Sequence, residues 1–375
     1  MRFLLNCTTI VIGGGIQVAA EICNQISKDS RHEWVVAASP QVRSALESRQ
    51  IQLDNVVDFT ASPARSRSAR RQVRELADET EPDSIFTVFG PAYTSFEQPH
   101  LCGVADGWVT HAGRTAYRSL KIPLQPARMI AVTIRKGLEY RRADAWVVEA
   151  DSAKRGLVRR FRISEDKISV VENNCAEHYF RADVVRKPLT GTIRLLTFAS
   201  AYRHKNLRII PKVAIELEKL RPDFDFQFVT TVNSESPVAK EFLRECQELR
   251  IEHRIENLGP ILLQDGPGLY ESCHVCFMPT LLETFSASYP EAMAMKLPIV
   301  TTDIDFAHDI CKGAAVYFSP FSPEDAARRI LELVDNPELA ENLTDAGTIR
   351  LAEFPHPKEK FELYVEILES LARKS

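Results

Sequence analysis

Short apolar runs alternate with amphipathic stretches along the whole chain. In the first half these runs predict buried strands at Phe3–Leu5, Trp34–Ala38, Ile85–Phe89, Trp108–Thr110, Ala145–Val148 and Ile168–Val171. A second series of strands is predicted at Ile193–Ala199, Phe226–Thr230, His274–Met278 and Pro298–Thr302. Helical periodicity falls between the runs, for example over Gln17–Ser27, Ser66–Glu79 and Asp151–Phe161. Strands that alternate with helices predict an α/β fold with parallel sheets flanked by helices.

The length of the chain, 375 residues, predicts two domains, because a single hydrophobic core seldom grows that large. We place the boundary where Lys187-Pro188 and Gly191 interrupt the pattern, so that residues 1–186 form the N-terminal domain and residues 187–355 the second domain. A last helix is predicted over Lys358–Lys374, after two prolines, within residues 356–375.

Composition and charge narrow the class of protein. Hydrophobic residues make up 45% of the chain, which is typical of a globular protein, and the formal net charge of −4 argues against bulk affinity for nucleic acid. The N-terminus reads as a first strand and not as a signal peptide, and no apolar run is long enough to cross a bilayer. The eight cysteines show no disulfide-framework spacing, so we expect a cytoplasmic protein.

The most informative segment contains two carboxylates, Glu283 and Glu291, eight positions apart. Glu291 falls in the first turn of a predicted helix, for which Ser286 or Ser288 can serve as N-cap and Pro290 suits the first turn. A helix N-terminus attracts phosphate, and carboxylates accept hydrogen bonds from sugar hydroxyls. The segment therefore suggests a nucleotide-sugar site, although a glutamate in a first turn is also stabilised by the helix dipole without any ligand.

Two other loops could meet phosphate. Gly13-Gly-Gly-Ile-Gln17 opens a predicted helix, so its backbone can approach a ligand closely; a simple tight turn would use the same glycines. It has neither the GxGxxG spacing of a dinucleotide site nor a P-loop lysine. Lys205 follows the first strand of the second half, where it can neutralise a diphosphate leaving group or remain a solvated basic residue.

These segments resemble the retaining GT-B glycosyltransferases of glycosyltransferase family four (group 1), of the bacterial surface-polysaccharide type. The resemblance is carried by Glu283, Glu291-Ala-Met-Ala294, Pro298 and Ile299-Val300, and it continues through Cys311-Lys-Gly-Ala-Ala-Val-Tyr-Phe318. It implies two Rossmann-like domains whose parallel sheets face each other across a cleft, with the last helix crossing back onto the N-terminal domain. It also implies that the anomeric configuration of the sugar is retained.

The resemblance assigns a role to each candidate residue. The catalytic candidates are Glu283, Lys205, Arg203 and His111, and the donor-binding candidates are Gly14, Gly15, Ile261, Thr284, Phe285, Ser286 and Glu291. By analogy with the family, Glu283 would hold hydroxyls of the transferred sugar and Glu291 those of the ribose. Lys205 would stabilise the departing diphosphate, and the backbone near Ile261 would meet the base. His111 would follow a strand of the first domain, near the donor sugar.

The chain also departs from the family. A Gly-Arg pair usually precedes the lysine by five or six residues, but Ala199 and Ser200 stand there, and we expect Arg203 to supply the missing charge. Ser286 replaces a usual glycine, which puts the sugar specificity in doubt. Asp303-Ile-Asp305 mimics the metal-binding motif of the other large glycosyltransferase fold, but it trails the Glu291 helix, so we interpret it as a loop and expect no metal.

The function implied is metal-independent transfer of a sugar from a nucleotide-diphosphate sugar, UDP- or GDP-linked, to a saccharide or lipid-linked acceptor in polysaccharide biosynthesis. The nucleotide sugar is a substrate, and no further cofactor is expected. Two alternatives stay open: an epimerase of the same fold, and a non-catalytic subunit that binds a nucleotide sugar. The arginine-rich segment suits either a solvated helix or peripheral contact with anionic lipid at the inner face of a membrane; it contains Arg65, Arg67, Arg70, Arg71 and Arg74.

Overall fold

The computed structural model describes residues 1–120, 125–180 and 183–374. The chain divides into two compact units. The first unit contains Met1–His111, Ala127–Asn173 and Pro355–Ser375, and the second contains Ala112–Pro126 and Asn174–Phe354. In this division residues 174–186 fall with the second unit, whereas the sequence led us to place them in the first domain.

The first unit is built on a seven-stranded parallel sheet with strand order β3-β2-β1-β4-β5-β6-β7. Its strands are β1 (Arg2–Cys7), β2 (Glu33–Ala38), β3 (Val56–Asp58), β4 (Ser84–Thr87), β5 (His100–Gly103), β6 (Ala145–Val148) and β7 (Ile168–Val170). In the centre of the sheet, Leu5 of β1 pairs with Val36 on one side and with Phe86 on the other. Nearly continuous burial of β1 and β4 follows from helices that cover both faces.

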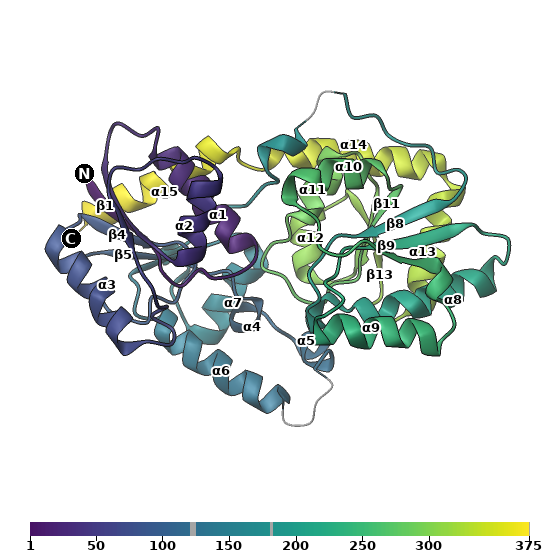
Figure 1. Ribbon diagram of the computed structural model, residues 1–375, viewed down its shortest axis with the longest axis horizontal. Coiled ribbons are helices and arrows are strands. Elements are labelled where there is room, and N and C mark those ends of the chain that lie inside the picture. The colour runs from purple at the N-terminus through teal and green to yellow at the C-terminus, as the bar shows by residue number, and fades with distance from the viewer. Residues whose placement is uncertain (121–124, 181–182, 375) are drawn as a thin grey trace. The chain divides into compact units, whose positions relative to one another are not determined.

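The helices of the first unit are α1 (Gly14–Ile26), α2 (Pro40–Ser48), α3 (Arg67–Thr80), α4 (Gly107–Thr110), α6 (Gln125–Tyr140), α7 (Asp151–Phe161) and α15 (Pro357–Ala372). Alternate residues of β1 belong to two different cores: Phe3 packs with α1, α2 and α15, while Leu4 packs with α3. The last helix, α15, lies beside α1 although the two are far apart in sequence (Figure 1).

The second unit is built on a six-stranded parallel sheet with strand order β10-β9-β8-β11-β12-β13. Its strands are β8 (Ile193–Thr197), β9 (Phe226–Thr230), β10 (Ile255–Asn257), β11 (Val275–Met278), β12 (Ile299–Thr302) and β13 (Ala315–Phe318). Its helices are α5 (Arg114–Arg118), α8 (Ile210–Leu220), α9 (Pro237–Glu248), α10 (Gly266–Glu271), α11 (Ser288–Ala294), α12 (Asp305–Cys311), α13 (Pro323–Asp335) and α14 (Pro337–Glu353).

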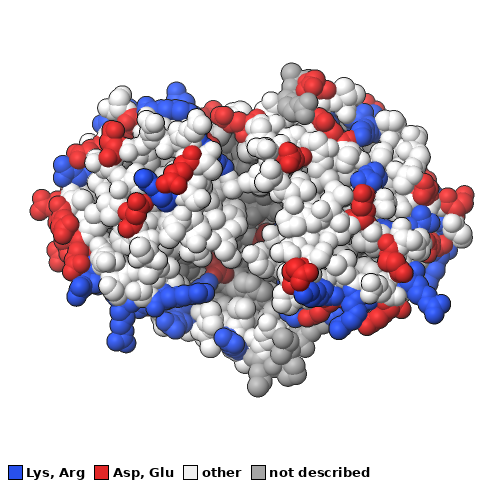
Figure 2. Space-filling model, viewed as in Figure 1, with Lys and Arg blue, Asp and Glu red and all other residues white. Residues whose placement is uncertain are grey.

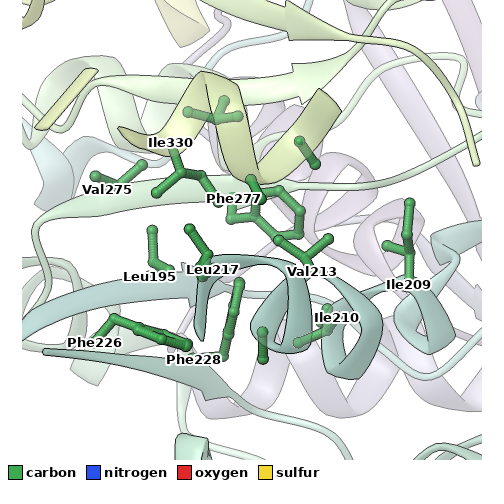
Figure 3. Close-up of a cluster of buried hydrophobic side chains, with 14 of the residues drawn as sticks. Leu195, Ile209, Ile210, Val213, Leu217, Phe226, Phe228, Val275, Phe277 and Ile330 are labelled. Atoms are coloured by element: carbon green, nitrogen blue, oxygen red, sulfur yellow. The ribbon is translucent and has the colours of Figure 1, made fainter. Parts of the chain in front are cut away.

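One core of the second unit fills the space between the sheet and the helices α8 and α13 (Figure 3). The strands contribute Leu195, Phe228 and Phe277, which are fully buried, and the helices contribute residues such as Val213 and Ile330. Burying a side chain of this kind stabilises a fold by roughly 1.5–3 kcal/mol. This packing fixes the strands whose ends carry the candidate site.

Each sheet changes direction once. In the second unit the chain runs from β8 outward to β9 and β10, and then crosses to β11 on the other side of β8. In the first unit the same change occurs between β1 and β4. Loops that leave the carboxyl ends of such neighbouring strands diverge, and ligands of open α/β sheets bind there.

Most strands that the sequence predicts are confirmed, but the strand at Trp108–Thr110 is wrong. These residues form α4, whose N-cap is Asp106: its carboxylate accepts a hydrogen bond from the backbone N–H of Val109 at 3.3 Å. An acidic cap and a following glycine favour a helix start over a strand. The fifth strand of the sheet is His100–Gly103 instead.

None of the helices among the described residues is both long and apolar enough to span a membrane.

Candidate functional site

The loops that follow β8 and β11 contact each other at the switch point of the second sheet. The backbone N–H of Leu281 donates to the carbonyl of His204 at 2.7 Å, and the hydroxyl of Thr280 lies 3.4 Å from the same oxygen. These contacts bring Lys205 and Glu283 together as an ion pair. Each of the two side chains is only 12% exposed, so the pair is largely shielded from water.

One carboxylate oxygen of Glu283 has two partners. Its Oε1 accepts a hydrogen bond from Thr280 Oγ1 at 3.0 Å, as well as the contact from Lys205 Nζ. A partly buried carboxylate with a cation and a hydroxyl as partners is held in one orientation.

Glu291 lies in α11 and is only 9% exposed. Burial raises the pKa of its carboxyl to about 7, while the hydroxyl of Tyr270 and the charge of Lys205 act in the opposite direction. Tyr270 donates its hydroxyl to Glu291 Oε2 at 2.9 Å. Lys205 therefore acts electrostatically on both carboxylates, Glu283 and Glu291.

The predicted N-cap of α11 is wrong. The residue before the helix is Ala287, and no side chain caps the first turn. Ser288 donates its hydroxyl to the carbonyl of Phe198 at 3.0 Å instead, because that oxygen in the loop after β8 lies within reach. Ser286, the other expected cap, is buried. The hydrogen bond from Ser288 to Phe198 thus ties α11 to the loop that carries Lys205.

The other donor-binding candidates of the second unit are Thr284, Phe285 and Ser286, which follow Glu283 in the chain, and Ile261. Thr284 and Ser286 are buried, and the ring of Phe285 meets that of Phe354 edge-on at 5.7 Å. Ile261 lies after β10, is half-buried, and packs against the same apolar cluster as Phe285.

Arg203 does not join the pair of Lys205 and Glu283. Its guanidinium makes two hydrogen bonds, of 3.0 and 2.7 Å, to the carboxylate of Glu241 in α9. This contact lowers the pKa of Glu241, and the arginine side chain is 17% exposed. The charge of Arg203 is therefore neutralised by α9, and its expected role at a diphosphate stays a prediction.

The other candidates belong to the first unit. Gly14 begins α1 after Gly13, whose φ of +70° favours glycine. A Cβ added to Gly15 would lie 3.3 Å from the ring of Phe89, in the loop after β4. The hydroxyl of Thr9 donates to the carbonyl of Phe89 at 2.9 Å, so the glycine loop lies at the switch point of this sheet.

His111 lies at the end of α4, and not after a strand as the sequence suggested. Its Nδ1 is 2.8 Å from the hydroxyl of Thr110. The contact holds the ring orientation.

Sequence reasoning missed Tyr270, which sets the environment of Glu291. The tyrosine belongs to the short helix α10, twenty-one positions before the glutamate. No motif or spacing marks this pair, because the contact depends on how α10 and α11 pack. A tyrosine in a helix that precedes a buried strand is the sole local signal.

Residues 193–336 match the family model described as "Glycosyl transferases group 1". The O-antigen chain mannosyltransferase RfbU of Salmonella typhimurium is 22% identical over 187 residues, which cover 49% of this chain and 50% of that protein. The match thus spans about half the length of this curated relative.

Solved structures resemble the whole chain. A glycosyltransferase from Rickettsia africae superposes with a TM-score of 0.75 at 15% identity, covering 100% of this chain and 99% of the other. Anabaena HepE, solved in complex with UDP and glucose, gives 0.72 at 16% identity, with 99% and 100% covered. The two Rossmann-like units with parallel sheets match GT-B glycosyltransferase structures, which confirms the predicted fold class. The matched family model, the curated relative and the Rickettsia structure are all described as glycosyltransferases.

Proposed function

We propose that the chain transfers a sugar from a nucleoside-diphosphate sugar, UDP- or GDP-linked, to a saccharide or lipid-linked acceptor in polysaccharide biosynthesis. The reaction retains the anomeric configuration and needs no metal. The observation that carries the proposal is the cluster of Lys205, Glu283 and Glu291 at the switch point of the second sheet, inside the matched residues 193–336. The acceptor would be met in the cytoplasm, at the inner face of a membrane.

Lys205 supplies the positive charge that a metal-free transfer requires. As the bond to the sugar breaks, negative charge develops on the diphosphate, and a fixed cation stabilises that charge most where water is excluded. Before the donor binds, Glu283 neutralises the lysine, so no unpaired charge is buried. Donor binding would exchange this contact for one to phosphate and leave the carboxylate of Glu283 to accept from sugar hydroxyls.

Glu291 would accept hydrogen bonds from the two ribose hydroxyls. In the free protein its pKa is about 7, so near neutral pH the carboxyl is only partly ionised. Hydroxyl donors stabilise the charged form and lower the pKa in the complex. Nucleotide binding should therefore release a proton, strengthen as the pH rises toward about 7, and level off above that value.

Calorimetry with UDP, GDP, ADP and CMP tests the site. We expect one nucleotide to be preferred, and Glu291→Gln to weaken its binding by at least tenfold, because a hydrogen bond to a charged group contributes about 1.5–3 kcal/mol. Lys205→Met should weaken it by a similar factor. Glu248→Gln and Lys240→Met, at exposed positions of α9, are the matched controls. Nucleotide binding that neither Glu291→Gln nor Lys205→Met weakens more than the controls do would refute the site.

Turnover tests the reaction. With the preferred donor, the protein should release the nucleoside diphosphate only when an acceptor is present, and proton NMR of the product should show the anomeric configuration of the donor. Transfer should continue in a chelator. Interconversion of the donor sugar without acceptor would show an epimerase instead, and binding without turnover on any acceptor would show a non-catalytic subunit.

A further inference from the structure

The helix α6 exposes large aliphatic side chains, whereas its buried residues are Thr133, Gly137 and Tyr140, so its apolar stripe is not the side that packs on the core. Ile130, Ile134 and Leu138 recur every fourth residue, so they form one stripe along the helix, and they are 46%, 55% and 58% exposed. The inward side carries Thr133 and Gly137, which are buried. Exposed apolar residues that are aligned in this way mark an interaction surface more strongly than scattered ones.

The packing of α6 explains this orientation. A Cβ at Gly137 would lie 1.8 Å from the ring of Phe161 in α7, so only a glycine fits on that side. The helix is anchored further by Lys136, whose Nζ lies 2.7 Å from a carboxylate oxygen of Asp106. Rotating α6 to bury its apolar stripe would break both contacts. The stripe therefore faces outward as a consequence of the packing of the first unit.

Positive charge accompanies the apolar stripe. On α6 itself, Arg128 and Arg135 are exposed, and the one carboxylate of the helix, Glu139, pairs with Arg142 at 3.1 Å. Long basic side chains beside an apolar stripe, with little negative charge, are typical of helices that lie in the interface of an anionic bilayer.

The beginning of α3 extends the basic surface. Arg70 lies over the ring of Tyr93 at 5.6 Å. Burial raises the pKa of the Tyr93 phenol, and the charges of Lys136 and Arg135 of α6 oppose that shift, so Tyr93 is near basic side chains of both helices. Exposed arginines flank this point just before and along the start of α3: Arg65, Arg67 and Arg74, with Arg71, which pairs with Glu75 at 3.2 Å. Figure 2 shows Lys and Arg side chains gathered along the lower edge of the first unit, where Figure 1 places α6 and the start of α3.

We propose that this surface, α6 together with the start of α3, docks the first unit onto an anionic lipid bilayer. Ile130, Ile134 and Leu138 enter the level of the headgroups and the first acyl carbons, while the arginines contact lipid phosphates. Lipid phosphate complements this charge, whereas a second copy of the same surface would bring positive charge against positive charge. The inference deepens the membrane contact proposed above, and it holds whether or not the chain transfers a sugar.

Vesicle flotation of the full chain tests the surface without any sugar donor. Vesicles of phosphatidylcholine alone are compared with vesicles that also contain phosphatidylglycerol. Ile134→Ser with Leu138→Ser removes the centre of the stripe, and Arg128→Gln with Arg135→Gln removes its charge. The matched controls are Ile349→Ser with Leu363→Ser, and Arg244→Gln with Arg328→Gln, all at exposed positions outside the surface.

We expect the native chain to float with the anionic vesicles and much less with the neutral ones. Each double variant of the surface should reduce the partition coefficient by at least tenfold, and both controls should leave it unchanged. The binding should weaken with salt, and less steeply in the arginine variant. An unchanged urea midpoint, followed by tryptophan fluorescence, shows that the variants remain folded.

Three results would overturn the proposal. The first is a stripe variant that floats as well as the native chain. The second is a native chain that binds neutral and anionic vesicles equally well, together with an arginine variant whose partition coefficient is unchanged. The third is an absence of vesicle binding together with a dimer, seen by analytical ultracentrifugation, that the stripe variant dissociates; the stripe would then cover a second copy of the chain.

Discussion

Acid should destabilise the first unit through one buried histidine. His100 begins β5, is 3% exposed, and has Nε2 at 2.8 Å from the hydroxyl of Thr87. That oxygen accepts a hydrogen bond from the amide of Asn6 at 3.1 Å, so the Thr87 hydroxyl is directed to donate to a neutral ring. Burial lowers the pKa of His100 from 6.5 to about 3.

The magnitude follows from linkage between protonation and unfolding. The folded-state pKa lies below the unfolded value, so the unfolded chain binds the proton more tightly. The contribution of neutral His100 to the free energy of unfolding is fully present above about pH 6.5 and is lost as the pH falls from there toward 3. Each pH unit in that window costs about 1.4 kcal/mol. Between pH 7 and pH 5 we expect His100 to remove about 2 kcal/mol from the free energy of unfolding.

The assay can isolate the first unit because all three tryptophans, Trp34, Trp108 and Trp146, belong to it. Urea unfolding followed by tryptophan fluorescence is measured at pH 7 and pH 5 for the native chain and for His100→Gln. The glutamine keeps a polar group near Thr87 but does not titrate in this range. The variant should start less stable and lose about 2 kcal/mol less than the native chain on acidification.

Other titrating groups cancel in this comparison because the two proteins share them. His308→Gln, at an exposed site of the second unit, is the control and should leave the fluorescence transition unchanged at both pH values. Parallel losses in the native chain and in His100→Gln would refute the reasoning, since they would mean that His100 is not held neutral by burial.

Three further predictions test the packing and the ion pairs. Gly156→Ala would place a Cβ 2.0 Å from the carbonyl oxygen of Thr110, so the urea midpoint of the first unit should fall by the equivalent of about 1–3 kcal/mol in spite of the better helix propensity of alanine. Lys205→Met leaves Glu283 without its cation and should lower the melting temperature in calorimetry. Adding Glu283→Gln to this variant should recover part of the loss. If Lys205 were merely solvated, the second substitution would recover nothing. Lys360→Met removes the cation 3.6 Å from the buried Glu149, whose pKa is already raised by burial; the fluorescence-detected loss of stability should be larger at pH 7 than at pH 5, and equal losses would contradict the assignment.

The sequence allowed good prediction where a segment's structure depends on its own periodicity. The helix Asp151–Phe161 has the predicted bounds, and so does the strand Ala145–Val148. Short strands without a long apolar run were missed, among them β3, which is mostly exposed, and β10, which is partly buried. The strand predicted at Trp108–Thr110 failed because an apolar triplet fits a buried helical turn equally well, and Asp106 decided between them.

The order of strands in a sheet cannot be predicted from the sequence of any one segment. The sequence placed Lys205 after one strand and Glu283 after another, but their contact depends on β8 and β11 being neighbours in the sheet. The same limit applies to Arg203. The sequence shows that Arg203 lies in a basic loop, but the direction of its side chain is set by Glu241, which belongs to the neighbouring helix α9.

The failed prediction of the α11 cap shows how the candidate site is held. Local rules treat a serine before a helix as a cap, because only the helix itself is considered. In the fold, the carbonyl of Phe198 takes the hydroxyl of Ser288, and the backbone of Leu281 donates to His204. Both bonds join the β11 side of the site to the loop after β8. The distance between Lys205 and the two carboxylates is therefore maintained by backbone and side-chain groups outside the cluster itself.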